Sequence, residues 1–319
     1  MSRGHGALPE GLGNEFSVGQ AARAGVGPGR LRGSDLERPF HGVRRVAATA
    51  RPSDDPFEQR RLDVLGLARA YAPRMRGCEF FSHETAALLW GAPLPSAVAG
   101  GIHVAVHVTN AEPRAVGVLG HRLSPALVTV VSRGGIRVAS PASTWAMLGH
   151  LHTFDLVAIG DYLTREWRRE GYFRANQGMP PLTTRAQLAA ALAAGRRTGG
   201  VRLRAALALI REDSWSRPES LTRCHLVVGG LPEPVLNRDF FDEHGVHLGC
   251  LDLSYPAYKV AVEYQGELHG ARYVKDIERL ERLRAHGWIV IQVTSELLDN
   301  PVELVRRVRA ALLGRGWRG

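Results

Sequence analysis

The amino-acid sequence predicts an α/β protein built from more than one domain. Segments in which apolar residues recur at helical spacing are interspersed with short apolar strands, which is typical of mixed α/β domains. The length of 319 residues is enough for two or three domains. Hydrophobic residues make up 45% of the chain and charged residues 23%, which excludes a disordered or fibrous protein.

The composition also limits where the chain works. The sequence has no run of 18 apolar residues, so we expect no membrane-spanning helix and no membrane partner. The first residues lack the apolar stretch of a signal peptide. Cys78, Cys224 and Cys250 are widely separated and form no CxxC pair, which argues against disulfides and a thiolate zinc site. We therefore expect a cytoplasmic protein.

Basic residues outnumber acidic residues by 41 to 31, which gives a formal net charge of +10. Arginine accounts for 39 of the basic residues, since Lys259 and Lys275 are the only lysines. This surplus points weakly toward nucleic acid. The alternative, which we favour on charge alone, is that arginine replaces lysine under a compositional bias and that much of the surplus is solvated surface. Residues 61–198 carry 15 basic and 8 acidic residues, whereas residues 199–319 carry 17 and 16. Most of the surplus therefore lies in the middle of the chain.

Four segments rich in proline, glycine or polar residues divide the chain. These segments are 1–13, 51–56, 171–181 and 195–200. The last of them has the composition of a linker between domains. The parts expected from these breaks are an N-terminal module at 14–60, a middle domain at 61–198 and a C-terminal domain at 199–319.

The N-terminal module has the outline of a winged helix-turn-helix. A capped helix is expected over 16–26, a second helix over 28–36, and a short hairpin or wing over 40–46. In this interpretation the second helix enters a DNA groove and the wing places Arg44 and Arg45 against DNA. The alternative is a small helical cap that makes protein contacts.

The middle domain mixes helices and strands. The expected elements are a capped helix at 82–91, a strand at 102–108, a hairpin at 128–139, and helices that begin at 140 and span 154–167. Asp161 is expected on a polar face of the last helix. His103 and His107 fall on one face of the expected strand, which suggests a metal site. With no third ligand nearby, we favour ordinary hydrogen bonding for both histidines.

The C-terminal domain has the clearest pattern. The expected elements are helices at 201–210, 218–226, 271–286 and 302–313 and strands at 246–253, 260–264 and 288–293. Asp252 and Glu263 are carboxylates within apolar strands, where burial is costly unless they are paired or bind a cation. On adjacent strands they can meet on one face and hold Mg²⁺, with Gln265 on the same face. The alternative is that both carboxylates pair with arginines at the surface.

The C-terminal domain resembles the DUF559 family, which is related to the very-short-patch mismatch-repair endonuclease within the PD-(D/E)XK nuclease superfamily. The residues that carry the resemblance are Glu219, Asp252, Glu263-Tyr264-Gln265-Gly266-Glu267-Leu268-His269, Asp276, Arg279, Leu283 and Gly287-Trp288-Ile289-Val290. The resemblance implies a mixed central sheet flanked by helices, with a Mg²⁺ site on its face.

The resemblance also implies roles for individual residues. Asp252 and Glu263 would bind Mg²⁺ or Mn²⁺, and Glu219 would be an outer or third acidic group. His269 would act as general acid/base or contact the phosphate, and Asp276 would orient His269 or an arginine. The last assignment is Arg279, which would contact DNA.

Two residues depart from the superfamily pattern. Gln265 stands at the lysine position, where DUF559 relatives often carry aspartate, and Leu251 stands where the superfamily has proline. A glutamine can orient water but cannot neutralise developing charge. A nuclease fold that binds DNA without cutting it therefore remains an alternative.

The front half resembles AbiEi-type antitoxins of type IV toxin–antitoxin systems. The resemblance rests on the pattern and order of 16–46, 81–87, 118–122 and 139–145. It implies a winged helix-turn-helix that binds operator DNA and a second domain that neutralises a cognate toxin.

Taken together, these resemblances and the carboxylate pattern predict a Mg²⁺-dependent DNA endonuclease acting in defence or repair. The alternative is an antitoxin-like regulator with an inactive nuclease domain.

Overall fold

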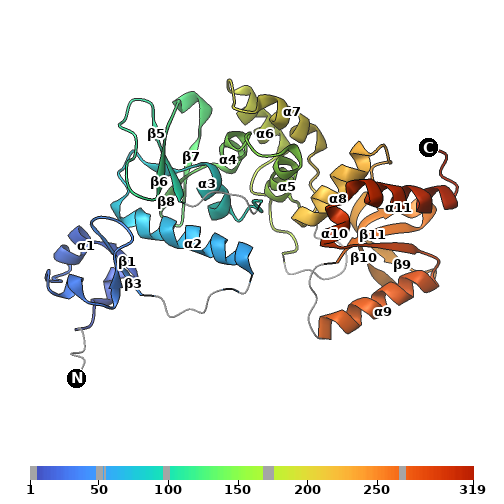
Figure 1. The fold of residues 1–319 in the computed structure, drawn as a ribbon, viewed down its shortest axis with the longest axis horizontal. Coiled ribbons are helices and arrows are strands. Elements are labelled where there is room, and N and C mark those ends of the chain that lie inside the picture. The colour runs from blue at the N-terminus through green and yellow to red at the C-terminus, as the bar shows by residue number, and fades with distance from the viewer. Residues whose placement is uncertain (1–5, 48–52, 54, 96–100, 168–175, 266–270) are drawn as a thin grey trace. The chain divides into compact units, whose positions relative to one another are not determined.

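The computed structural model describes the chain except residues 1–5, 48–52, 54, 96–100, 168–175 and 266–270 (Figure 1). The chain divides into two compact units, which we describe separately. The first comprises Met1–Leu148 with Ala193–Thr198, and the second comprises Gly149–Leu192 with Gly199–Gly319. Helices and sheets occur in both, so the predicted α/β class is confirmed. The expected N-terminal module and most of the expected middle domain share the first unit, whereas residues 149–192 group with the C-terminal part.

The N-terminal part of the first unit is a small antiparallel sheet with one short helix. Its strands are β1 (Glu15–Ser17), β3 (Val43–Val46) and β2 (Leu36–Glu37), in that spatial order, and its helix is α1 (Val18–Arg23). Ser17 and Gln20 form a reciprocal capping box at the start of α1. Phe16, Ala21 and Leu31 are buried together beneath the sheet and helix.

The second helix expected over 28–36 is absent, so this part of the helix-turn-helix prediction is wrong. Only a single 3-10 turn, Arg30–Arg32, forms there, and β2 follows it. The glycines on either side of the turn disfavour a helix. An ion pair between Arg30 and Asp35, with 2.6 Å between nitrogen and oxygen, closes the segment into a turn instead.

The rest of the first unit is a five-stranded mixed sheet with helices. Its strands, in spatial order, are β6 (Val118–Leu123), β5 (Ile102–His107), β4 (Phe80–Phe81), β8 (Ile136–Ala139) and β7 (Val130–Arg133). Its helices are α2 (Pro56–Tyr71), α3 (His83–Trp90) and α4 (Pro141–Met147). The expected strand at 102–108, the hairpin at 128–139, and the helices at 82–91 and from 140 are confirmed. Strands β4 and β6 were not predicted, because β4 has only two residues and β6 lacks a continuous apolar alternation.

The second unit begins with helices α5 (Thr153–Thr164), α6 (Arg185–Ala193) and α7 (Gly200–Leu209). The prediction of a polar face at Asp161 is wrong, because this residue is only 1% exposed. Its carboxylate accepts hydrogen bonds from the Arg211 backbone N–H at 2.7 Å and the Ser220 hydroxyl at 2.8 Å. It also forms an ion pair with the fully buried Arg223 at 3.1 Å. Asp161 therefore joins α5 to the helix that carries Ser220 and Arg223.

The C-terminal part of the second unit is a four-stranded mixed sheet with helices on both faces (Figure 1). In chain order its elements are α8 (Arg217–Val228), β9 (Val235–Phe241), β10 (His247–Tyr255), β11 (Val260–Tyr264), α9 (Ala271–Ala285), β12 (Ile289–Val293), α10 (Ser295–Leu298) and α11 (Pro301–Gly314). The spatial order is β12-β11-β10-β9, and only the β11–β12 pair is parallel. All the elements predicted here form, while β9 and the short helix α10 were not predicted.

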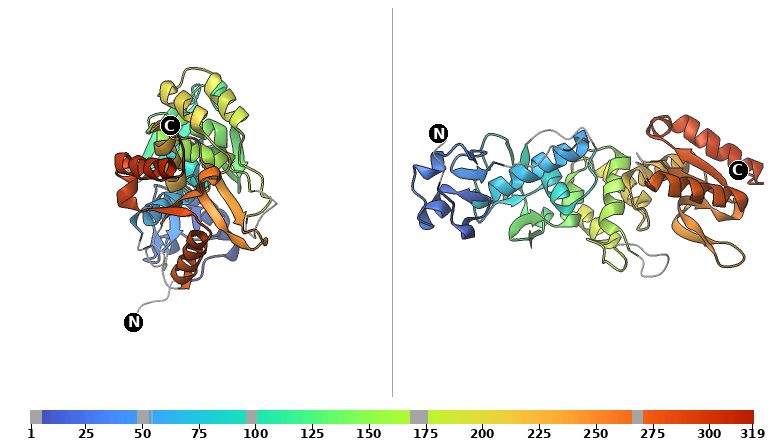
Figure 2. Two further views of the ribbon diagram at one scale, coloured as in Figure 1. Left: turned by 90° about the vertical axis from the view of Figure 1, so that its right-hand side faces the viewer. Right: turned by 90° about the horizontal axis from the view of Figure 1, so that it is seen from below.

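Alternate residues of β11 pack on opposite faces of this sheet. Ala261 is buried with Leu283 of α9, whereas Val262 is buried with Leu304 and Val308 of α11. Figure 2 shows the same two helices from further directions. Within the described part of the chain, no helix has both the length and the apolar character needed to cross a membrane.

The buried Asp161–Arg223 pair generates a stability prediction. Asp161→Ala should lower the free energy of unfolding by about 3–5 kcal/mol, because it leaves a buried guanidinium without its main counter-charge. Glu281→Ala is the control, since Glu281 pairs with Arg284 at the surface, where such pairs contribute at most about 1 kcal/mol. Urea unfolding followed by circular dichroism measures both variants. Equal effects in the two variants would contradict the structural role of Asp161.

Candidate functional site

Asp252 and Glu263 face each other across β10 and β11. The antiparallel register pairs Leu253 with Val262, and one further step along it places the two carboxylates opposite each other. The Asp252 backbone N–H donates to Glu263 Oε1 at 3.0 Å, and the Tyr264 backbone N–H donates to Asp252 Oδ2 at 3.0 Å. Backbone groups of the facing strand therefore fix the orientation of each carboxylate.

The charges of these carboxylates are only partly compensated. Burial raises the pKa of Asp252 well above its ordinary value, and the negative charges of Glu263 and Glu219 raise it further. The hydrogen bond from Tyr264 and the charge of Arg279 act in the opposite direction but do not outweigh these causes. A cation between the carboxylates would relieve this repulsion.

Arg279 of α9 supplies positive charge to Glu263. Its Nη2 donates to Glu263 Oε2 at 2.8 Å, and its Nη1 donates to the Cys250 carbonyl at 3.1 Å. From the sequence, this arginine was expected to contact DNA, and pairing of the carboxylates with arginines at the surface was the alternative. For Glu263 the structure has that pairing, but with the carboxylate buried (2% exposed) and not at the surface.

A glycine makes room for the Arg279 side chain. Gly249 of β10 has φ of 155°, and a Cβ at this position would lie 3.0 Å from Arg279 Cδ and 3.1 Å from its Cγ. Both the backbone conformation and the close approach therefore favour glycine. The arginine reaches Glu263 by crossing β10 at this position.

Glu219 lies in the first turn of α8 and is buried. Its Oε2 accepts hydrogen bonds from the Trp215 backbone N–H at 2.9 Å and from Asn237 Nδ2 at 2.7 Å. The same amide of Asn237 donates to the Asp213 carbonyl at 2.8 Å. Asn237 was not identified from the sequence, and the only available signal was a polar residue within the apolar start of β9.

The structure describes three other predicted site residues, Gln265, His269 and Asp276, less completely. Gln265 follows β11, and its backbone N–H donates to the Val293 carbonyl at 2.9 Å, which extends the pairing with β12. His269 lies outside the described residues. Asp276 lies on α9, and its side chain is outside the described part of the structure. Of the predicted residues, the structure thus brings together Asp252, Glu263 and Arg279, with Glu219 close enough to affect the pKa of Asp252.

Arg44 and Arg45, predicted to contact DNA, both have partners within their own module. Arg44 Nε donates to the Leu31 carbonyl at 2.8 Å. Arg45 Nε donates to Glu37 Oε2 at 2.8 Å across the β2–β3 pair. Contact of these residues with DNA stays a prediction.

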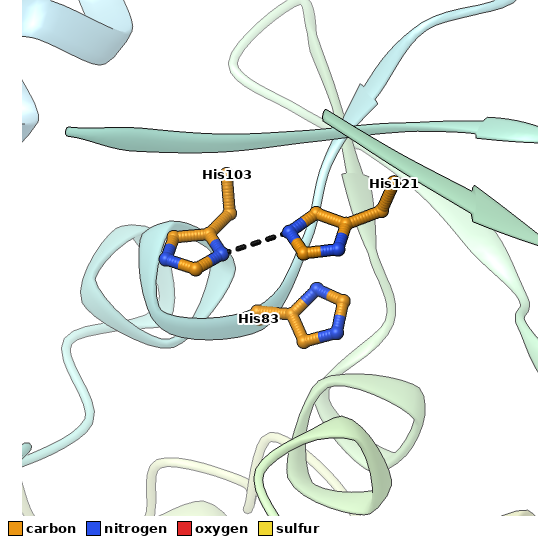
Figure 3. A group of neighbouring side chains, drawn as sticks. All are labelled: His83, His103 and His121. Atoms are coloured by element: carbon orange, nitrogen blue, oxygen red, sulfur yellow. Dashed lines mark hydrogen bonds between the residues drawn. The ribbon is translucent and has the colours of Figure 1, made fainter. Parts of the chain in front are cut away.

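The histidine interpretation needs a correction. His103 and His107 were predicted to share a strand face without a third ligand. In the first unit, His103 lies instead beside His83 and His121 (Figure 3). Neither of these two histidines was identified from the sequence as a possible metal ligand. The His107 ring packs against Phe80, with 5.5 Å between ring centroids. Among the residues described here, His83, His103 and His121 are the only group of three or more potential ligands whose atoms lie within 4.8 Å of one another.

Comparisons with protein-family models, with curated proteins and with solved structures each found no match. The resemblances to the DUF559 family and to AbiEi-type antitoxins therefore rest on the sequence features quoted above. The geometry of the carboxylate pair stands independently of them.

The crossing of Arg279 over Gly249 can be tested by substitution. Gly249→Ala should destabilise the protein by roughly 1–3 kcal/mol, because the added Cβ meets both a strained backbone and the arginine side chain. Gly245→Ala is the matched control, since Gly245 also has positive φ (79°) but has no heavy atom within 4 Å of the added Cβ. Urea unfolding curves compare the two variants. A smaller loss for Gly249→Ala than for Gly245→Ala would contradict the proposed crossing.

Proposed function

We propose that the chain is a Mg²⁺-dependent DNA endonuclease whose site is centred on Asp252 and Glu263. The observation that carries the proposal is a pair of carboxylates facing each other on adjacent strands, with the pKa of Asp252 raised by burial and by its acidic neighbours. A packing role does not require two like charges in this position. Oxygen donors of this kind are the ligands that Mg²⁺ and Mn²⁺ prefer.

The roles follow from the donor set. Asp252 and Glu263 would hold the cation, which when bound polarises a phosphodiester and lowers the pKa of an attacking water. Glu219 accepts hydrogen bonds from the Trp215 backbone N–H and the Asn237 amide, and its negative charge acts on Asp252. Gln265 would orient the water. His269 would transfer a proton, since an ordinary imidazole titrates near neutral pH.

The fold supports this proposal. The mixed four-stranded sheet with helices on both faces is the architecture that the nuclease resemblance implies. The carboxylate pair lies on β10 and β11, the two middle strands of that sheet. We propose DNA as the substrate and phosphodiester hydrolysis as the reaction.

Isosteric substitutions test the metal ligands. Asp252→Asn and Glu263→Gln should each lower Mg²⁺-dependent nicking of supercoiled DNA by about 100-fold or more, because a neutral amide binds the cation weakly. Glu243→Gln should leave nicking unchanged, since that side chain is 87% exposed and lies in the turn before β10. The assay follows conversion of supercoiled to open-circular plasmid with Mg²⁺, with Mn²⁺ and with a chelator. Nicking that persists in both ligand variants would overturn the assignment.

Two observations favour a second function. Arg279 already neutralises part of the charge of Glu263, and Gln265 replaces the usual lysine. Both features suit a nuclease-like domain that binds DNA without cutting it, within an antitoxin-like regulator that has a cognate toxin as partner. The same plasmid assay separates the two functions. Binding of DNA by the unmodified protein, with no nicking under either cation, would favour the regulator.

The raised pKa of Asp252 predicts a pH dependence. Only the ionised carboxylate binds Mg²⁺, so protonation should weaken cation binding as the pH falls through the raised pKa. The Mg²⁺ concentration needed for half-maximal nicking should therefore increase as the pH is lowered, and saturating Mg²⁺ should restore part of the rate. Nicking rates measured against both pH and Mg²⁺ test this. A half-maximal Mg²⁺ concentration independent of pH would contradict it.

A further inference from the structure

Three histidines from three different elements meet in the first unit (Figure 3). His83 is the first residue of α3, His103 lies on β5 and His121 lies on β6. One nitrogen from each lies within 4.8 Å of the others. His103 Nδ1 and His121 Nε2 are 2.9 Å apart, and the His83 ring stacks on that of His121 with 4.0 Å between centroids.

The fold brings these residues together through strand pairing. The parallel register pairs Ala105 of β5 with His121 of β6, and His103 is two residues before Ala105. His103 and His121 therefore project from the same face of the sheet. The backbone of His103 also bonds to the start of α3: its N–H donates to Thr85 Oγ1 at 2.8 Å, and its carbonyl accepts from the Ser82 N–H at 3.1 Å.

The backbone of His83 is in a costly conformation. Its φ is 47°, in the left-handed region that most residues avoid. Strain of this kind persists where the surrounding structure requires it, and it clusters at functional sites. Here it occurs at the residue that directs a third imidazole toward His121.

The carboxylate of Glu84 lies beside His103, at the place where a metal-bound histidine has an outer partner. His103 Nε2 lies 3.2 Å from Glu84 Oε2, and both side chains are largely buried. With Nε2 facing this carboxylate, Nδ1 is the nitrogen left for a metal, and in the structure Nδ1 lies 2.9 Å from His121 Nε2. Histidines that bind metals nearly always have such an outer partner for their second nitrogen.

We propose that His83, His103 and His121 bind one zinc ion, with Glu84 as the outer partner of His103. Imidazole nitrogens suit Zn²⁺, whereas Mg²⁺ and Ca²⁺ prefer oxygen. Three histidines leave a fourth coordination position for water or a small anion, as in open zinc sites. The ion would tie the start of α3 to β5 and β6. This site is separate from the carboxylate pair and does not depend on the proposed nuclease function.

Zinc content tests the site directly. The full chain, prepared without a polyhistidine tag, is loaded with zinc, dialysed against metal-free buffer containing millimolar Mg²⁺, and analysed by mass spectrometry of the metal. Mg²⁺ saturates carboxylate sites but competes poorly for imidazoles. We expect about one zinc per chain, in line with the one three-histidine group found among the described residues.

The variants separate metal binding from folding. His83→Asn and His103→Ala should lose the zinc, and Glu84→Gln should weaken zinc binding by about 10–100-fold. Asparagine adopts positive φ more readily than most residues, so the His83→Asn variant should fold even if the His103→Ala variant does not. His107→Ala, on the same strand, and Asp252→Asn should keep the full zinc content. Circular dichroism checks the fold of each variant. No bound zinc in the unmodified chain, or unchanged zinc in a folded His83→Asn variant, would overturn the proposal.

Discussion

The repulsion between Asp252 and Glu263 is the constraint to which the surrounding part of the second unit is adapted. Like charges on facing strands destabilise each other most where water is scarce. The fold responds with backbone N–H groups from the facing strand and with Arg279, whose path requires a glycine on β10. These partners fix the carboxylate oxygens, yet the pKa of Asp252 remains raised. The pair is therefore held by hydrogen bonds but incompletely neutralised, and the proposed cation site depends on this combination.

The carboxylate pair was predictable because its signal is local. A charged residue within an apolar strand stands out in the sequence, and two such strands close together in the chain pair readily. Asn237 and the burial of Asp161 had no such signal. Asp161 depends on Arg223, which lies far along the chain and contributes to the helical periodicity of α8 like any polar residue. Periodicity reports which positions can face solvent, and it does not reveal that two of them are buried against each other.

The histidine cluster also depends on contacts between residues that are far apart in the sequence. His103 was identified from the sequence as a possible ligand. His121 lies beside it because β6 pairs in parallel with β5, and His83 lies there because its backbone is left-handed. Neither has a local sequence signature. The absent second helix at the N-terminus differs, because its glycines were visible in the sequence and argued against it. For the segment 28–36, the low helix propensity of glycine was a better guide than the outline of a helix-turn-helix.

The placement of the arginines changes the meaning of the net charge. Several guanidinium groups donate to backbone carbonyls within their own unit, at the ends of helices or in turns. The carbonyl acceptors are Leu31 for Arg44, His150 for Arg202, Gly229 for Arg309 and Gly287 for Arg315. Lysine cannot replace arginine equally in such contacts, because its ammonium lacks the planar set of donors. A structural demand for arginine thus accounts for some of the basic residues outside 61–198, the range that carries most of the surplus. These groups still add to the long-range field that would attract a polyanion, but some of their donors are already used within the fold, so net charge alone would overstate the number of direct phosphate contacts that the chain could make.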